Sequence, residues 1–285
     1  MIPAAFDYVA PDSLDAALDA LAQHGDDAKI LAGGQSLLPV LRMRLNAPEV
    51  VIDLGRIEGL RGIREEGDHV VIGAMTTYAD ILASDLVREH LALLVAAVET
   101  VADSQIRHRG TIGGSLVHAD PAGDVGPAVL ALDATLVIAG RGGARREVAV
   151  GDFFEDLFAT AVGDDEILAE VRLPKHTGWG AAYEKFVRVA QQWSIVAVAA
   201  TVDRTGGTIG AAKVAMANMG ATPLRASAVE AALDHQPATA ETVAAAAAKA
   251  GEGTNPPSDL NGDAAYRTHL ATVLTRRAVT AALGE

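Results

Sequence analysis

Two short stretches with the same glycine pattern decide the architecture of this chain: AGGQS at residues 32–36 and TIGGS at residues 111–115. Glycine lets backbone amides approach a ligand closely and adopts positive φ without strain. Consecutive amides in such a turn form an anion-binding concavity, and the start of a following helix adds positive potential. We expect two strand-to-glycine turns from separate subdomains, with the hydroxyls of Ser36 and Ser115 as extra donors, that hold the two phosphates of a dinucleotide between them.

A second interpretation of these stretches stays open, because a Gly-Gly pair after a strand is usually only a turn. Neither stretch matches the G-x-G-x-x-G or the G-x-x-x-x-G-K-[ST] pattern, so neither a Rossmann fold nor a P-loop is favoured. Two matching loops in one chain favour the diphosphate clamp over two ordinary turns.

The sequence around the two stretches alternates between helical and extended patterns. Ser13 is the expected cap of a helix that ends at Gly25. Further helices are predicted at 36–44, 77–84, 86–101, 124–132, 224–233, 238–250 and 266–283, and strands at 29–32, 50–54, 69–74, 135–139, 146–150, 166–173, 181–186, 194–202 and 208–216. The pattern divides into residues 1–175, with subdomains at about 1–57 and 58–175, and residues 176–285.

Composition narrows the class of protein. The 285 residues carry a formal net charge of −14 with no run of basic residues, so binding to nucleic acid is not expected. There is no cysteine, so this chain cannot ligate an iron–sulfur cluster through thiolates. Neither a signal peptide nor a run of 18 apolar residues is visible, which predicts a cytoplasmic protein without a membrane span, with a peripheral position at the inner membrane face left open.

The same glycine stretches resemble those of a known family. Residues 32–39 (AGGQSLLP) are similar to the A-G-G-[HQ]-S-L-[IL]-P loop of the FAD-binding medium subunits of molybdenum hydroxylases, of the carbon monoxide dehydrogenase and xanthine dehydrogenase types. Residues 111–115 resemble their T-[IV]-G-G-[NS] loop, and residues 102–107 (ADSQIR) their A-D-x-Q-I-R segment. The resemblance extends over essentially the whole chain.

This resemblance implies a fold and a function. The fold is α+β: a two-subdomain FAD-binding domain of the vanillyl-alcohol-oxidase/PCMH-like type, followed by a smaller C-terminal domain of antiparallel strands and helices. The function is electron transfer from [2Fe–2S] clusters of a small partner subunit through FAD to quinone, NAD or O2. A large partner subunit would hold the molybdenum cofactor, in a dimer of heterotrimers. Carbon monoxide dehydrogenase or a related heterocycle hydroxylase is the candidate complex.

The resemblance also implies the cofactor contacts. The first loop would wrap the pyrophosphate mainly through backbone groups, Ala102 would line the adenosine side, and Asp124 would contact ribose or ribityl hydroxyls. Trp193 stands where the carbon monoxide enzyme has Tyr beside the flavin ring, which leaves the substrate branch open. The full predicted set is Lys29, Ile30, Leu31, Ala32, Gly33, Gly34, Gln35, Ser36, Ala102, Thr111, Gly113, Gly114, Ser115, Asp124, Ala161, Lys185 and Trp193.

Simpler interpretations exist for the polar residues outside the glycine stretches. His118, Asp120 and Asp124 are too few for a defined metal site and are expected to shape a loop. The basic trio at 107–109 is either a solvated loop or a contact for an acidic ligand or partner. Lys185 can be a solvent-facing charge and Trp193 a core residue.

The sequence contains no recognisable catalytic constellation, since no Ser–His–Asp order, H-E-x-x-H or paired-carboxylate motif is present. No catalytic residue is therefore assigned. The alternatives to the electron relay are a free-standing FAD-dependent oxidase and a non-catalytic nucleotide-binding scaffold.

Overall fold

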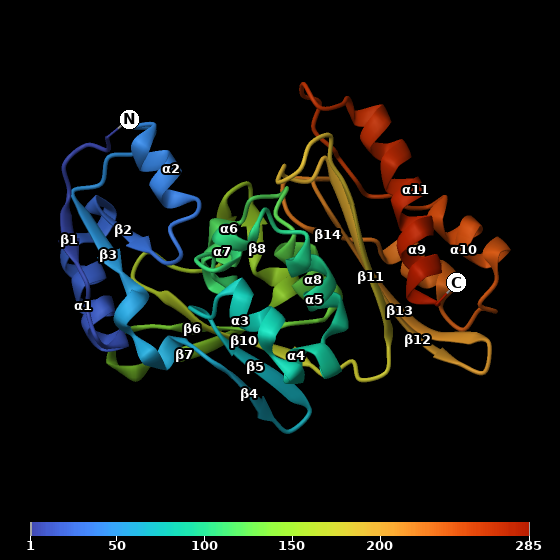
Figure 1. The fold of residues 1–285 in the computed structure, drawn as a ribbon, viewed down its shortest axis with the longest axis horizontal. Helices are drawn as coiled ribbons and strands as arrows, with labels where there is room; N and C mark the ends of the chain where they lie inside the picture. Colours follow the sequence, from blue (N-terminus) through green and yellow to red (C-terminus); the bar gives the residue numbers. More distant parts are fainter. Residues whose placement is uncertain (1, 285) are drawn as a thin grey trace.

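The N-terminal lobe is a small parallel sheet in the computed structural model, which describes residues 2–284 (Figure 1). The strand order is β1-β3-β2, with Ile30 of β2 opposite Ile52 of β3. The strands are β1 (Asp7–Val9), β2 (Ala28–Leu31) and β3 (Val50–Asp53), and the helices are α1 (Leu14–His24) and α2 (Leu37–Arg42). The Ser13 hydroxyl accepts a hydrogen bond from the Ala16 amide at the start of α1, so the predicted cap is confirmed.

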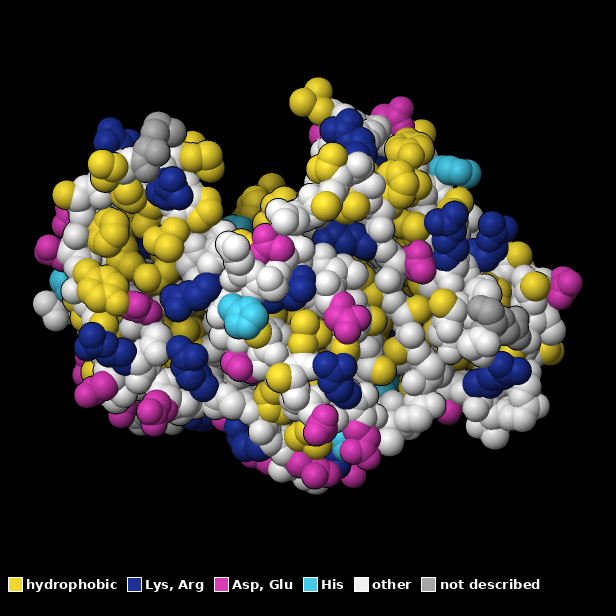
Figure 2. Space-filling model, viewed as in Figure 1, with side chains coloured by type: hydrophobic (Ala, Val, Ile, Leu, Met, Phe, Trp, Pro, Cys, Tyr) yellow, Lys and Arg dark blue, Asp and Glu magenta, His cyan; other side chains and the backbone are white. Residues whose placement is uncertain are grey.

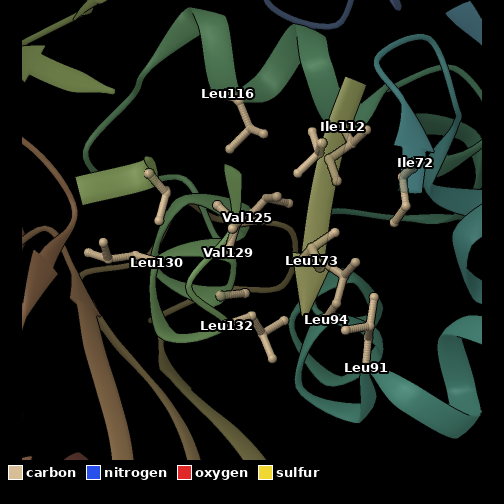
Figure 3. Close-up of a cluster of buried hydrophobic side chains, with 14 of the residues drawn as sticks. Ile72, Leu91, Leu94, Ile112, Leu116, Val125, Val129, Leu130, Leu132 and Leu173 are labelled. Atoms are coloured by element: carbon tan, nitrogen blue, oxygen red, sulfur yellow. The ribbon is translucent and has the colours of Figure 1, made fainter. Parts of the chain in front are cut away.

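The central lobe contains a five-stranded antiparallel sheet in the order β4-β5-β10-β6-β7. Its strands are β4 (Ile63–Glu66), β5 (His69–Gly73), β6 (Thr135–Ala139), β7 (Arg145–Ala149) and β10 (Ile167–Pro174); β8 (Phe154–Asp156) and β9 (Ala159–Thr160) form a separate ribbon. Its helices are α3 (Tyr78–Ala83), α4 (Asp85–His90), α5 (Ala92–Glu99), α6 (Ser104–Arg107), α7 (Ile112–His118) and α8 (Val125–Ala131). Side chains of this sheet and these helices meet in the largest apolar core (Figure 3).

The C-terminal lobe is a four-stranded antiparallel sheet in the order β11-β12-β13-β14, and helix α11 packs on β11 and β12. Helices α5 and α8 of the central lobe contact β11 and β13, so helices of two lobes flank this sheet. The elements are β11 (Gly180–Phe186), β12 (Val196–Thr205), β13 (Thr208–Ala217), β14 (Leu224–Arg225), α9 (Ser227–Leu233), α10 (Ala240–Ala247) and α11 (Ala264–Ala282).

The link between the central and C-terminal lobes is held against the central lobe. Lys175 bonds Glu65 and the Gly67 carbonyl, and the His176 amide donates to the His90 carbonyl. We propose the boundary between the two domains at residues 175 and 176, and the subdomain boundary at about residue 57.

The α+β character is as predicted, with several differences in detail. The helix predicted over 86–101 is interrupted at Leu91, whose φ and ψ of −132° and 48° are not helical, and it forms α4 and α5. The helix predicted from residue 224 starts at Ser227, because residues 224–225 pair with β13. Strands β1, β4, β8 and β9 and helices α6 and α7 were not predicted. Within residues 2–284, no helix is long and apolar enough to cross a membrane.

Candidate functional site: a cleft between two glycine motifs

A cleft of about 1160 Å³ runs between the N-terminal lobe, the central lobe and the loop that joins β11 to β12. Figure 2 shows the molecular surface indented between the lobe that holds α2 and the rest of the molecule. Typical small-molecule sites have volumes of about 300–1,000 Å³, so this cleft has room for an extended ligand. Both glycine stretches line it.

The first glycine motif, residues 32–36, follows strand β2 as predicted. Gly34 has a φ of +77°, in the left-handed region that favours glycine. The backbone amides of residues 33–36 donate no hydrogen bond to any acceptor within residues 2–284. Four consecutive amides beside an open cleft are a site for an anionic group, because a backbone donor without an acceptor is costly unless ligand or water satisfies it.

The second glycine motif, residues 111–115, is not the strand-to-glycine turn that was predicted. Thr111 is the N-cap of helix α7, and both glycines lie in the first turn of that helix. The Gly113 amide donates to the Ala74 carbonyl at 2.8 Å and the Gly114 amide to Thr111 Oγ1 at 3.1 Å. Ile112 and Ser115 also have backbone acceptors. The amides of residues 112–115 are therefore used by the fold, although Ser115 still lines the cleft.

The two motifs pack directly against each other. A Cβ added to Gly33 would lie 2.2 Å from the carbonyl oxygen of Arg109 and 2.8 Å from Cα of Gly110. A Cβ added to Gly114 would lie 3.1 Å from the Ala32 Cβ. These glycines allow the N-terminal lobe to touch the central lobe at backbone distance, so close packing explains them as directly as ligand contact does.

A buried polar network forms another part of the cleft wall. Asp124 precedes α8, and its Oδ2 accepts from Lys185 Nζ at 2.7 Å. Its Oδ1 accepts from the Tyr183 hydroxyl at 2.8 Å and from the Ser194 hydroxyl at 2.7 Å. Burial raises the pKa of the Asp124 carboxyl, and Lys185, Ser194 and Tyr183 oppose that rise. The network joins the central lobe to strand β11 and to the loop just before β12.

Lys185 is not the solvent-facing charge of the simpler interpretation, since its side chain is 9% exposed. It donates to Asp124 and to the Thr100 carbonyl at 3.2 Å. An ammonium has three donors, so one remains for a group in the cleft. Trp193 is not a core residue either, because it is 53% exposed at the cleft rim.

The structure brings most of the predicted contact residues together. The predicted residues that line the cleft are Lys29, Ile30, Ala32, Gly33, Gly34, Gln35, Ser36, Ala102, Thr111, Gly113, Gly114, Ser115, Asp124, Lys185 and Trp193. Leu31 and Ala161 are not among the lining residues; Ala161 instead packs against the apolar core.

Sequence reasoning missed Tyr183 and Ser194, which hold Asp124. The two-residue period of a strand places Tyr183 on the same face as Lys185, and that signal could have identified it. Two residues of the basic trio have local partners: Arg107 donates to the Val101 carbonyl, and His108 Nδ1 lies 2.6 Å from the Ser104 carbonyl oxygen. Residues 2–284 contain no group of three or more metal-ligating side chains.

The residues present fit FAD on the evidence of the cleft itself. The four unpaired amides at 33–36 suit a phosphate, and the remaining donor of Lys185 suits an acceptor elsewhere on a long ligand. The cleft joins these points with a continuous surface from all three lobes.

Two family models cover the chain. The FAD binding domain in molybdopterin dehydrogenase matches residues 4–176, and the CO dehydrogenase flavoprotein C-terminal domain matches residues 181–282. The carbon monoxide dehydrogenase medium chain of Hydrogenophaga pseudoflava is 41% identical over 99% of this chain and 98% of its own. The nicotine 6-hydroxylase medium subunit of Paenarthrobacter nicotinovorans is 37% identical over 95% of each chain.

Solved structures agree with these relatives. Carbon monoxide dehydrogenase from Hydrogenophaga pseudoflava, in a form that lacks the Mo-pyranopterin moiety, matches with a TM-score of 0.96 and 43% identity. Quinoline 2-oxidoreductase from Pseudomonas putida 86 matches with a TM-score of 0.93 and 32% identity. Each match covers 100% of this chain and 99% of the other. The predicted fold class is confirmed, and the chain belongs to the family of FAD-binding medium subunits of molybdenum hydroxylases, which are oxidoreductases.

Proposed function

We propose that this subunit is an electron relay. Electrons from [2Fe–2S] clusters on a small partner subunit would leave through FAD held in the cleft, toward quinone, NAD or O2. When bound, FAD joins one-electron donors to two-electron acceptors. This chain has no cysteine, so the clusters in this proposal would be held by another subunit.

The observation that carries the proposal is the set of four unpaired amides at residues 33–36 on the cleft wall. They would hold the pyrophosphate, and the hydroxyls of Ser36 and Ser115 would add donors from the two motifs. Ala102, at φ +39°, would line the adenosine side through its backbone. Asp124 and Lys185 would fix the ribityl or ribose side, and Trp193 would contact the ring.

The remaining subunits would complete the enzyme. A large subunit with the molybdenum cofactor would oxidise the substrate, and two heterotrimers would form the complex. Relatives of this chain are subunits that act with carbon monoxide, nicotine and caffeine, at 41%, 37% and 33% identity. Similar medium chains thus serve chemically unlike substrates, which supports substrate selection on another subunit. Carbon monoxide dehydrogenase or a related heterocycle hydroxylase is the proposed complex.

The test uses the purified chain and the reconstituted complex. We expect the chain to bind FAD, and we expect the flavin to be reduced by substrate only when the large subunit and the cluster-bearing small subunit are present. A small subunit without its clusters is the matched control. Direct reduction of the isolated flavoprotein by an organic substrate would instead favour a free-standing oxidase. A chain that takes up no FAD on titration would contradict both.

A further inference from the structure

We propose that Arg267, on helix α11, is a positioning residue for the part of the cleft wall that Trp193 forms. The inference rests on the proposed function in one respect: the cleft is taken as the FAD site. Arg267 itself does not line the cleft. It would act by fixing the backbone on either side of Trp193.

Arg267 is fully buried, and its guanidinium joins three separate points of the chain. It donates to the carbonyl oxygen of Ile195, two residues after Trp193, and to the carbonyl oxygen of Gly262 at 3.4 Å. It also forms an ion pair with Asp259 at 2.7 Å. The first contact spans 72 positions of sequence and ties the start of β12 to α11.

The residues beside Trp193 are each anchored to a different element. Gln192 donates to Asn261 Oδ1 at 3.1 Å, in the loop before α11 that Arg267 also holds. The Ser194 hydroxyl donates to Asp124, and the Ser194 carbonyl accepts from the Asn218 side chain at 2.8 Å. Trp193 is thus an exposed side chain on a backbone held from both directions. Its place over the cleft follows from those anchors and not from packing of the indole.

The choice of arginine supports a positioning role. The guanidinium is fully buried whereas its partner Asp259 is 45% exposed, and an ion pair open to solvent adds little net stability. The planar fork reaches two carbonyls and a carboxylate at once, which a lysine ammonium on a flexible stem does not reproduce. Arg267→Lys therefore retains the charge but not the geometry.

The loop position can be measured without flavin, because the chain has only two tryptophans. In a Trp179→Phe background, Trp193 is the single indole fluorophore. We expect Arg267→Lys to change its emission maximum and its quenching by acrylamide. We also expect the Kd for FAD to rise roughly tenfold, the size of an ordinary coupling between residues that act together. In a Trp193→Ala background, the same substitution should change the Kd for FAD less than twofold.

Two control variants separate positioning from general loss of stability. Arg204→Met removes another arginine bond between β12 and α11, the one to the Leu283 carbonyl at the far end of the strand. Leu274→Ala removes a buried side chain from the same helix and does not touch the loop. Neither variant should alter Trp193 emission in the folded protein, although the second should lower Tm.

The proposal is overturned if Arg267→Lys leaves both Trp193 emission and FAD affinity unchanged. It is also overturned if Leu274→Ala produces the same changes, because they would then report lost stability. A wild-type chain that binds no FAD would refute the proposed function, while the emission measurements on flavin-free protein would still decide whether Arg267 positions Trp193.

Discussion

The two glycine motifs look alike in sequence and differ in the structure. Residues 32–36 leave a strand and present four amides without acceptors in the described chain. Residues 111–115 begin helix α7, and the amides from Ile112 to Ser115 already have acceptors. The first motif is thus open to a ligand, and the second is closed by its own fold. A shared Gly-Gly-polar pattern does not imply a shared use, because the following backbone decides whether the amides are free.

The largest expected loss of stability follows from breaking the buried ion pair between Asp124 and Lys185 in the cleft wall. Lys185→Met would leave the Asp124 carboxylate buried without its cation, and breaking such a pair costs about 3–5 kcal/mol. Denaturant unfolding of the flavin-free chain measures this loss. The double variant Asp124→Asn with Lys185→Met removes both charges and should recover part of the stability. If the unfolding free energy of Lys185→Met lies within about 1 kcal/mol of the wild-type value, the ion pair between Lys185 and Asp124 does not stabilise the fold.

The contact between the motifs is tested by adding a methyl group at each of the two glycines of the first motif, of which only Gly33 faces the central lobe. Gly33→Ala would drive a Cβ into the Arg109 carbonyl and should cost about 1–3 kcal/mol of stability, as overpacking does. Gly34→Ala meets the flexible side chains of Leu38 and Leu31, and its left-handed backbone costs about 1–2 kcal/mol. We expect the lower Tm for Gly33→Ala. Equal Tm values would mean that the motifs separate easily.

Removing one hydroxyl from each motif distinguishes a structural role from a role in FAD binding. Thr111→Val removes the cap of α7 and should cost about 1 kcal/mol of stability. Ser36 makes no capping bond, so Ser36→Ala should change stability by less than about 0.5 kcal/mol. The order of the two variants should be reversed for FAD binding: the Kd for FAD should increase more for Ser36→Ala than for Thr111→Val. If Thr111→Val affects FAD more than stability, the second motif is a ligand site too.

The smallest expected effect is a change in how the stability of the chain depends on pH, through His176. Burial lowers the pKa of His176, which lies in the segment before β11, although its bond to the Pro174 carbonyl opposes the shift. The folded state then binds fewer protons than the unfolded state below the ordinary pKa of about 6.5. Stability should rise with pH up to that value. His176→Asn should reduce the rise of Tm with pH between about pH 5 and 6.5. If the rise is unchanged in this variant, other groups cause it.

Most helices and strands were predictable from the sequence. Strand β6 and the cap of α1 follow from local patterns. Both glycine motifs line one cleft, and their contact with one ligand stays a prediction. The helical state of residues 112–118 was not predictable, because two glycines weigh against a helix and only the Thr111 cap and the Ala74 carbonyl favour it. The strand period places Tyr183 beside Lys185, but the contact of Ser194 with Asp124 depends on how the lobes meet, which local sequence does not encode.

The difference between the motifs can be measured directly by amide hydrogen exchange with and without FAD. We predict that the amides of residues 33–36 exchange rapidly in the flavin-free chain and become protected when FAD binds. The amides of residues 112–115 should be protected in both states, because the fold already supplies their acceptors. New protection at 112–115 with none at 33–36 would contradict the account and would place the phosphates on the second motif.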